Sequence, residues 1–92
     1  MEIKKQNKEG GENMRNPLQE IREKNNWSIQ EFASVTGLSF TAAYNCLNGN
    51  TQNINQRILD ALEQMNYNPD IVEADYQDYR KAKKQELMQE AI

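Results

Sequence analysis

The sequence predicts an all-α fold of four to five helices, and three observations lead to this prediction. Helix-start signals recur along the chain, for example at Asn16-Pro17 and at Ser28. Apolar residues recur at helical spacing at positions 54, 58, 61, 62 and 65. The alternation of apolar and polar residues that indicates β-strands is not sustained in any stretch of the chain. We therefore expect helices alone.

The first two helices are defined by the residues at their ends. Asn16-Pro17 combines a favoured N-cap with a proline that fits the first helical turn, so a short helix is expected from here to about Asn25. Ser28 and Glu31 have the spacing of a capping box, which predicts that a second helix follows. We expect this helix to end at Thr36-Gly37, because glycine adopts the left-handed conformation that ends many helices.

The third and fourth helices are predicted by similar signals. A helix is expected over Phe40–Leu47, with Ser39 as its N-cap and Asn48-Gly49 as its end. After a polar loop, the apolar residues between positions 54 and 65 predict the next helix. The sequence Asn66-Tyr67-Asn68-Pro69 ends it, since proline disfavours the helical conformation in the residue before it.

Residues 70–92 predict a C-terminal helix. Val72, Tyr76 and Tyr79 are spaced i, i+4 and i+7, which predicts an apolar stripe that docks on the domain or on a second subunit. Beyond Tyr79 we expect the helix to fray unless a partner covers Leu87–Ile92. The basic residues of the segment 80–84 form either a solvated face or a contact with DNA or another anionic partner.

Composition limits the size and the chemistry of the protein. The chain has 92 residues, of which 37% are hydrophobic, so one small domain over residues 16–69 is expected, flanked by polar segments. The single cysteine, Cys46, cannot form an internal disulfide, and histidine is absent. Neither a conventional zinc site nor a Cys–His catalytic pair is therefore available. We expect Cys46 to be a core residue and the protein to be no enzyme and to use no cofactor.

Residues 1–15 are polar, contain paired glycines and carry four basic and three acidic side chains, which predicts a disordered arm. Three interpretations of it remain open. It is a solvated tail, an arm that contacts DNA, or a translated leader before a native start at Met14, because codons for residues 9–14 can contain a bacterial ribosome-binding sequence. The first residues lack an apolar signal core, and no stretch approaches the ~18 apolar residues of a membrane span. We expect a cytoplasmic protein without a membrane partner.

The two short helices that meet at Gly37 are the most informative element of the sequence. A tight turn between two helices needs a residue that adopts positive φ, and Gly37 supplies it. It also needs a small residue where the helices cross, and Ala33 supplies that. Ala43 and Cys46 are spaced to point inward from the next helix, which leaves its other face outward. Such a motif presents its second helix to the major groove of DNA.

These residues carry a resemblance to a known family. Leu18-Gln-Glu-Ile-Arg22, Ser28-Ile-Gln-Glu-Phe-Ala33, Gly37-Leu-Ser39 and Asn48-Gly49 stand in the order and with the gaps of that family's pattern. Over residues 17–69 the chain resembles the phage Cro/repressor-type (xenobiotic-response-element) helix-turn-helix family. Met65-Asn-Tyr-Asn-Pro69 is similar, more weakly, to the end of a helix in the lactose-repressor headpiece. The resemblance implies a lambda-repressor-like bundle with a C-terminal helical extension.

The resemblance also implies a function and a set of residues. It implies a homodimeric transcriptional regulator of bacterial, phage or mobile-element type, with repression of a double-stranded DNA operator as the expected activity. The residues that would approach bases and phosphates correspond here to Ser39, Phe40, Thr41, Tyr44, Asn45 and Asn48. An asparagine such as Asn45 can form two hydrogen bonds to the edge of an adenine. Phosphate contacts are expected from Asn50, Thr51 and Gln52, and from Gln30, which lies beside the position where the family often has glutamine.

The sequence departs from the family pattern in its charge. From Ser28 to Gln56 the chain has no lysine or arginine, although these residues supply most non-specific affinity for DNA. Two interpretations follow. Either the protein binds DNA through Asn, Thr and Tyr hydrogen bonds, with a shallow dependence on salt, or it is a protein-interaction module of antirepressor or antitoxin type that uses Phe40 and Tyr44 as anchors. No small-molecule ligand is evident in either case.

Overall fold

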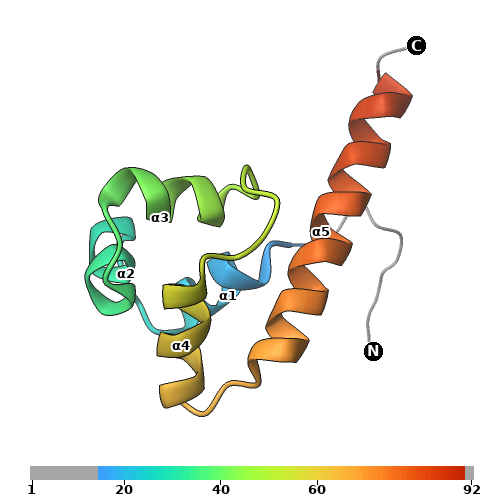
Figure 1. Ribbon diagram of the computed structural model, residues 1–92. Coiled ribbons are helices and arrows are strands. Elements are labelled where there is room, and N and C mark those ends of the chain that lie inside the picture. Colours follow the sequence, from blue (N-terminus) through green and yellow to red (C-terminus); the bar gives the residue numbers. More distant parts are fainter. Residues whose placement is uncertain (1–14, 91–92) are drawn as a thin grey trace, which may run out of the picture.

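The computed structural model describes residues 15–90, which form five helices and no strand (Figure 1). The helices are α1 (Pro17–Lys24), α2 (Ile29–Thr36), α3 (Phe40–Leu47), α4 (Gln56–Gln64) and α5 (Pro69–Glu90). The all-α prediction is confirmed. The predicted arm up to residue 14, with its proposed start at Met14, lies outside the described residues, as do the last two residues. Within them, no helix combines the length and the apolar character that a membrane crossing requires.

An asparagine or serine side chain caps the N-terminus of each of the five helices. Asn16, Ser28 and Ser39 accept hydrogen bonds from N–H groups in the first turns of α1, α2 and α3, as predicted. The predicted capping box at Ser28 is complete. Asn55 and Asn68 accept hydrogen bonds at the starts of α4 and α5 in the same way. These caps pair N–H groups that would otherwise lack a partner within the helix.

The hydrophobic core lies where the short helices meet. Helix α2 packs against α3 and α4, while α1 packs against α3 and α5. The largest fully buried side chains are Tyr76, Phe32, Leu18, Leu47, Ile58 and Leu62. Ala33 and Ala43, the small residues expected on inner faces of the motif, are buried, and so is Cys46. The prediction that Cys46 is a core residue is confirmed.

The burial of α2 and the start of α4 differ from what the helical spacing of apolar residues indicates. Val35 belongs to the apolar positions of α2 but is 43% exposed, and Thr36 is buried instead. The Thr36 hydroxyl donates to the carbonyl O of Phe32 at 2.9 Å, which makes its burial acceptable. Ile54 precedes α4 rather than lying within it, because the cap residue Asn55 starts the helix one residue later. Ile54 is nevertheless buried.

Helix α5 is longer than the sequence analysis predicts. It continues to Glu90 instead of fraying beyond Tyr79. Most residues of the segment 81–90 are strong helix formers. Arg80 and Lys83 also tie the helix to the loop after α3 by hydrogen bonds to backbone carbonyl groups. Figure 1 shows that the C-terminal half of α5 extends past α3.

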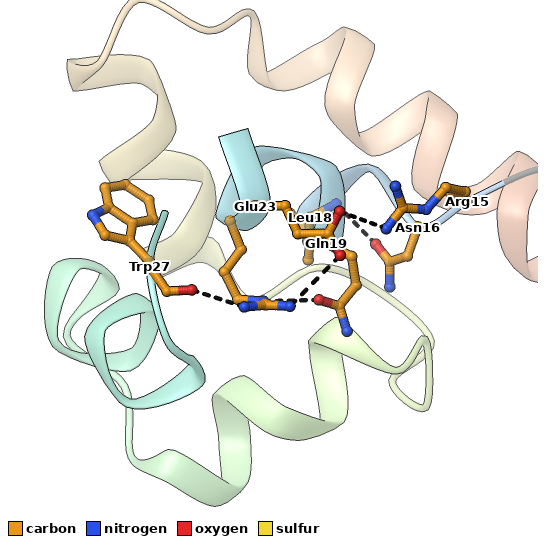
Figure 2. A network of polar contacts seen from close by, with 7 residues as sticks. Arg15, Asn16, Leu18, Gln19, Glu23 and Trp27 are labelled. Carbon is orange, nitrogen blue, oxygen red and sulfur yellow. Dashed lines mark hydrogen bonds and ion pairs between the residues drawn. The ribbon is translucent and has the colours of Figure 1, made fainter. Parts of the chain in front are cut away.

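Asn16 joins the start of α1 to the end of α3. Its side chain is 3% exposed, and Figure 2 shows it at the first turn of α1 beside Leu18. The Oδ1 atom accepts a hydrogen bond from the Leu18 N–H at 2.9 Å. The Nδ2 atom donates to the carbonyl O of Cys46 at 2.9 Å and of Leu47 at 2.8 Å. One buried side chain therefore pairs backbone groups at the termini of two helices.

A second set of polar contacts holds the connection between α1 and α2 (Figure 2). Arg22 donates from Nη1 to the carbonyl O of Trp27 at 2.7 Å and from Nε to Gln19 Oε1 at 2.8 Å. Arg15 forms an ion pair with Glu23 at 2.8 Å. These two arginines, which precede the predicted DNA-binding motif, therefore make contacts within the fold.

We expect Asn16→Ala to lower the free energy of unfolding by about 3 kcal/mol. The change removes an N-cap worth about 1 kcal/mol and two hydrogen bonds to carbonyl groups at the end of α3, worth about 1 kcal/mol each. The Cys46 carbonyl keeps the Gly49 N–H as a donor. Urea denaturation followed by circular dichroism measures the loss.

Asn55→Ala is the matched control, because Asn55 is an exposed cap that accepts a hydrogen bond from the Arg57 N–H. Its expected loss is about 1 kcal/mol. Equal losses in the two variants would contradict the role of Asn16 in joining α1 to α3.

Candidate nucleic-acid interface

Helices α2 and α3 are joined by a tight turn at Gly37. This residue has φ of 75° and ψ of 23°, in the left-handed region that was predicted for it. The N–H of Leu38 donates to the carbonyl O of Ala33 at 3.0 Å, which closes the end of α2. Ala33 is 4% exposed, so its small side chain lets the two helices approach each other. The turn thereby sets the direction in which α3 leaves α2.

Helix α3 has one buried face and one exposed face. The buried residues are Ala43, Cys46 and Leu47. Phe40 and Tyr44 are 51% and 46% exposed, and their rings stack with centroids 6.1 Å apart and planes 15° apart. Thr41 is exposed as well, and Asn45 is half-buried. Four of the five residues predicted to face outward are thus accessible on the surface of α3. The fifth, Asn48, is the half-buried residue that caps its C-terminus.

Gln30 and Ser39 lie at the starts of α2 and α3, and both are exposed. The Ser39 Oγ atom accepts a hydrogen bond from the Ala42 N–H at 3.2 Å. A serine hydroxyl that accepts one hydrogen bond can still donate another. Ser39 can therefore cap α3 and bind an acceptor from outside the protein at the same time.

The predicted phosphate contacts in the loop after α3 are of two kinds. Asn50 and Gln52 are exposed. Thr51 is half-buried, and its Oγ1 atom donates to the carbonyl O of Asn53 at 2.9 Å and lies 2.8 Å from Tyr76 Oη. The Thr51 hydroxyl therefore helps to hold the loop in place. Asn50 and Gln52 present their side chains outward.

Tyr76 anchors this loop to α5. Its side chain is fully buried, and Oη donates to the carbonyl O of Thr51 at 2.7 Å. Burial raises the pKa of the Tyr76 phenol above its usual value, and the hydrogen bond to the Thr51 side chain partly offsets that effect. Val72 is also buried, and the Tyr79 ring lies against Gly49. The three residues of the predicted docking stripe all pack within their own chain.

Basic side chains reach both ends of α3. Before the helix, Arg57 of α4 donates from Nη1 to the carbonyl O of Gly37 at 3.0 Å. After it, Arg80 Nε and Lys83 Nζ of α5 each donate to a carbonyl O of the loop at 3.2 Å. Residues 39–56 contain no charged side chain, so the interface takes its positive charge from α4 and α5.

The sequence alone did not connect these cations with α3. It shows Arg57 only as a charge near the motif, and it leaves the basic segment of α5 open between solvent and an anionic partner. A signal was present, because Arg80 and Lys83 follow Tyr76 at i+4 and i+7 and share its side of the helix. The buried position of Tyr76 is the fact that turns this spacing into a contact with the loop.

The arrangement favours hydrogen bonding and apolar contact with a partner. Within residues 15–90, no group of three or more His, Cys, Asp and Glu side chains gathers in a way that could hold a metal ion. Cys46 is buried, with its Sγ atom 3.4 Å from Thr51 Oγ1. Its position fits packing rather than reaction with an external substrate.

Comparison with known proteins agrees with this geometry. A family model described as helix-turn-helix matches residues 18–65, which is more than half of the chain. The match begins in α1, contains α2 and α3 and ends just after α4. Neither a curated protein nor a solved structure matches the chain significantly.

We expect Tyr76→Phe to lower the free energy of unfolding by about 1–2 kcal/mol at neutral pH, because the carbonyl of Thr51 loses its donor. The folded protein holds the phenol proton more tightly than the unfolded chain, since the pKa is raised on folding. The stability of the native protein is therefore full below the usual tyrosine pKa of about 10 and falls as the pH rises through the folded-state value. Denaturation at several pH values should show the difference from Tyr76→Phe shrinking in strongly alkaline solution. A constant difference would be inconsistent with this role.

Gly37→Ala and Gly49→Ala form a pair that tests the contact between α5 and the loop. Both glycines have positive φ, of 75° and 73°, so each substitution costs about 1–2 kcal/mol of backbone strain. An alanine Cβ at Gly49 would also lie 2.5 Å from Cε2 of Tyr79, whereas nothing lies within 4 Å at Gly37. Thermal unfolding should show a larger loss for Gly49→Ala. Equal losses would mean that the Tyr79 ring moves aside without cost.

Proposed function

Because the chain belongs to the Cro/repressor-type helix-turn-helix family of DNA-binding regulators, we propose that it is a transcriptional repressor. It binds a double-stranded DNA operator as a homodimer, in a bacterial, phage or mobile-element setting. Helix α3 enters the major groove of the operator and reads its sequence. The protein acts by occupying the operator, without catalysis and without a cofactor.

The observation that carries this proposal is the division of α3 into two faces. Ala43 and Cys46 fix the helix in the core, while Phe40, Thr41 and Tyr44 are exposed. A helix held in this way presents side chains outward in a constant geometry, which base recognition requires. Ser39 and Asn48 lie at the two ends of α3. From there, contacts with phosphates would position the protein on the duplex.

The residue types on α3 favour operators rich in A·T pairs. Guanine is most often read by arginine or lysine, and α3 contains neither. Asn45 suits the N6 and N7 atoms of adenine, and Thr41 and Phe40 suit the methyl group of thymine. The half-site is therefore expected to contain an A·T step opposite the middle of α3.

The homodimer is proposed because family members read two half-sites about one DNA turn apart. Val72 and Tyr76 are buried within one chain, so a second subunit has to use another surface.

A second candidate function is favoured by the stacked pair of Phe40 and Tyr44. Exposed aromatic side chains are frequent anchors of protein interfaces, and a helix without charge suits a protein groove. In this alternative the chain binds another protein, as an antirepressor or antitoxin does. We favour DNA because the family is one of DNA-binding regulators.

Selection of bound duplexes from a random DNA pool tests the proposal, since the operator sequence need not be known in advance. We expect the full chain to enrich a palindromic, A·T-rich site. Fluorescence anisotropy on this site should show Asn45→Ala weakening binding about 10- to 100-fold, because a bidentate contact contributes about 1–3 kcal/mol of discrimination. Binding to a scrambled duplex should change little.

Gln64→Ala is the matched control. Gln64 is exposed at the end of α4 that lies away from α3 in Figure 1. Failure to enrich any sequence, or equal effects of Asn45→Ala and Gln64→Ala, would reject sequence reading by α3.

A further inference from the structure

An open groove lies between the C-terminal half of α5 and the loop after α3. Its volume is about 760 Å³, and its lining combines Asn50 and four basic side chains with the apolar Leu87 and Met88 near the end of α5. The basic residues are Arg80, Lys81, Lys83 and Lys84. Four basic side chains thus face one concave surface next to the end of α3. This groove has no part in the base-reading face of α3.

The groove is electrostatically one-sided. Residues 70–90 contain six acidic side chains, which exceed the four basic ones, yet none of the acidic residues lines the groove. Asp78 stands three residues before Lys81, close to it on the helix surface, but it is not among the residues that line the groove. The lining itself therefore carries positive charge alone.

The inner cations of the groove are held in place by the fold. Lys83 Nζ donates to the carbonyl O of Asn48 at 3.2 Å and lies 5.9 Å from the centre of the Tyr79 ring. Arg80 Nε donates to the carbonyl O of Gly49 at 3.2 Å. Cations that are already positioned lose less conformational entropy when they bind an anion. Lys81 and Lys84 are exposed and complete the basic surface.

The position of the groove relates it to DNA. An eight-residue helix such as α3 is about 12 Å long, which is close to the width of the major groove of B-DNA. The residues just beyond the end of α3 therefore come near a phosphate backbone when α3 crosses the major groove. Asn50 is such a residue, and it lines the basic groove.

We propose that this groove binds the phosphodiester backbone of DNA beside the base-reading helix. The proposal rests on the proposed function, and it assigns to α5 the phosphate contacts that α3 cannot make. Lysine and arginine that neutralise phosphates release counterions, which gives affinity without sequence preference. Recognition is then divided between the uncharged α3, which reads bases, and the basic side of α5, which holds the backbone.

The Lys81→Gln/Lys84→Gln double variant of the full chain tests this proposal. Neither change removes a hydrogen bond that holds the fold between residues 15 and 90. The affinity for the selected duplex and for a scrambled duplex is measured by anisotropy between about 50 and 200 mM salt. The logarithm of the affinity decreases linearly with the logarithm of the salt concentration. We expect this slope to become shallower by about 0.9 for each lysine that contacts a phosphate, on both duplexes.

Two matched controls separate charge and position. Lys81→Arg/Lys84→Arg keeps the charge and should keep the slope of the native protein. Lys24→Gln removes a charge from α1, where Lys24 lies beside Tyr67 and Ile71 at the other end of α5, and should leave the slope unchanged.

The outcomes distinguish this proposal from the proposed function. If the native protein binds the selected duplex and the double glutamine variant keeps its full slope, α5 does not contact the backbone, while base reading by α3 stands. If no sequence is enriched but the double variant weakens binding to any duplex, the basic groove stands and sequence-specific repression does not. If the native protein binds no duplex, as a protein-interaction module would, both proposals fail.

Discussion

The buried amide of Asn16 is the contact on which the arrangement of the interface depends. Its side chain pairs the first turn of α1 with the carbonyl groups of Cys46 and Leu47 at the end of α3. Helix α1 in turn packs against α5, and α5 holds the loop after α3 through Tyr76. Polar contacts from α1 and from α5 therefore hold the C-terminal end of α3 and the loop after it. The contacts from α1 also provide hydrogen-bond donors to the last carbonyl groups of α3. Apolar packing alone is less directional, and it would leave the Leu47 carbonyl without the donor that Asn16 supplies.

This scaffold explains how a chain with a net charge of −3 can belong to a DNA-binding family. Charge matters where it faces the duplex, and the surface next to α3 receives its cations from Arg57, Arg80 and Lys83. Each of them also donates to a backbone carbonyl near an end of α3. The same side chains thus stabilise the ends of the motif and set its local electrostatic potential. Arg15 and Arg22, which are also close to the motif in the sequence, instead contact Glu23 of α1 and the connection that follows it.

Most of the helices could be predicted because their ends depend on residues close together in the sequence. The features that the sequence did not predict depend on contacts between distant residues. The caps at Ser28 and Ser39 depend on residues within three positions, so the sequence alone identifies them. The left-handed turn at Gly37 is predictable for the same reason. The burial of Thr36 is not, because it depends on which side of α2 meets its neighbours. The contact of Lys83 with Asn48 joins residues 35 positions apart, and it becomes visible only once α5 has been placed against the loop.

Chemical-shift mapping of the isotope-labelled full chain, titrated with the selected duplex, tests most directly where DNA lies. We expect the largest amide shifts in residues 39–50 and 80–84, which form the outer side of α3, its loop and the basic side of α5. The apolar groove between α1 and α5, beside Tyr67 and Ile71, should stay unchanged and serves as an internal reference. Shifts centred on that groove, with α3 and the basic side of α5 unaffected, would contradict the assignment of this interface to DNA.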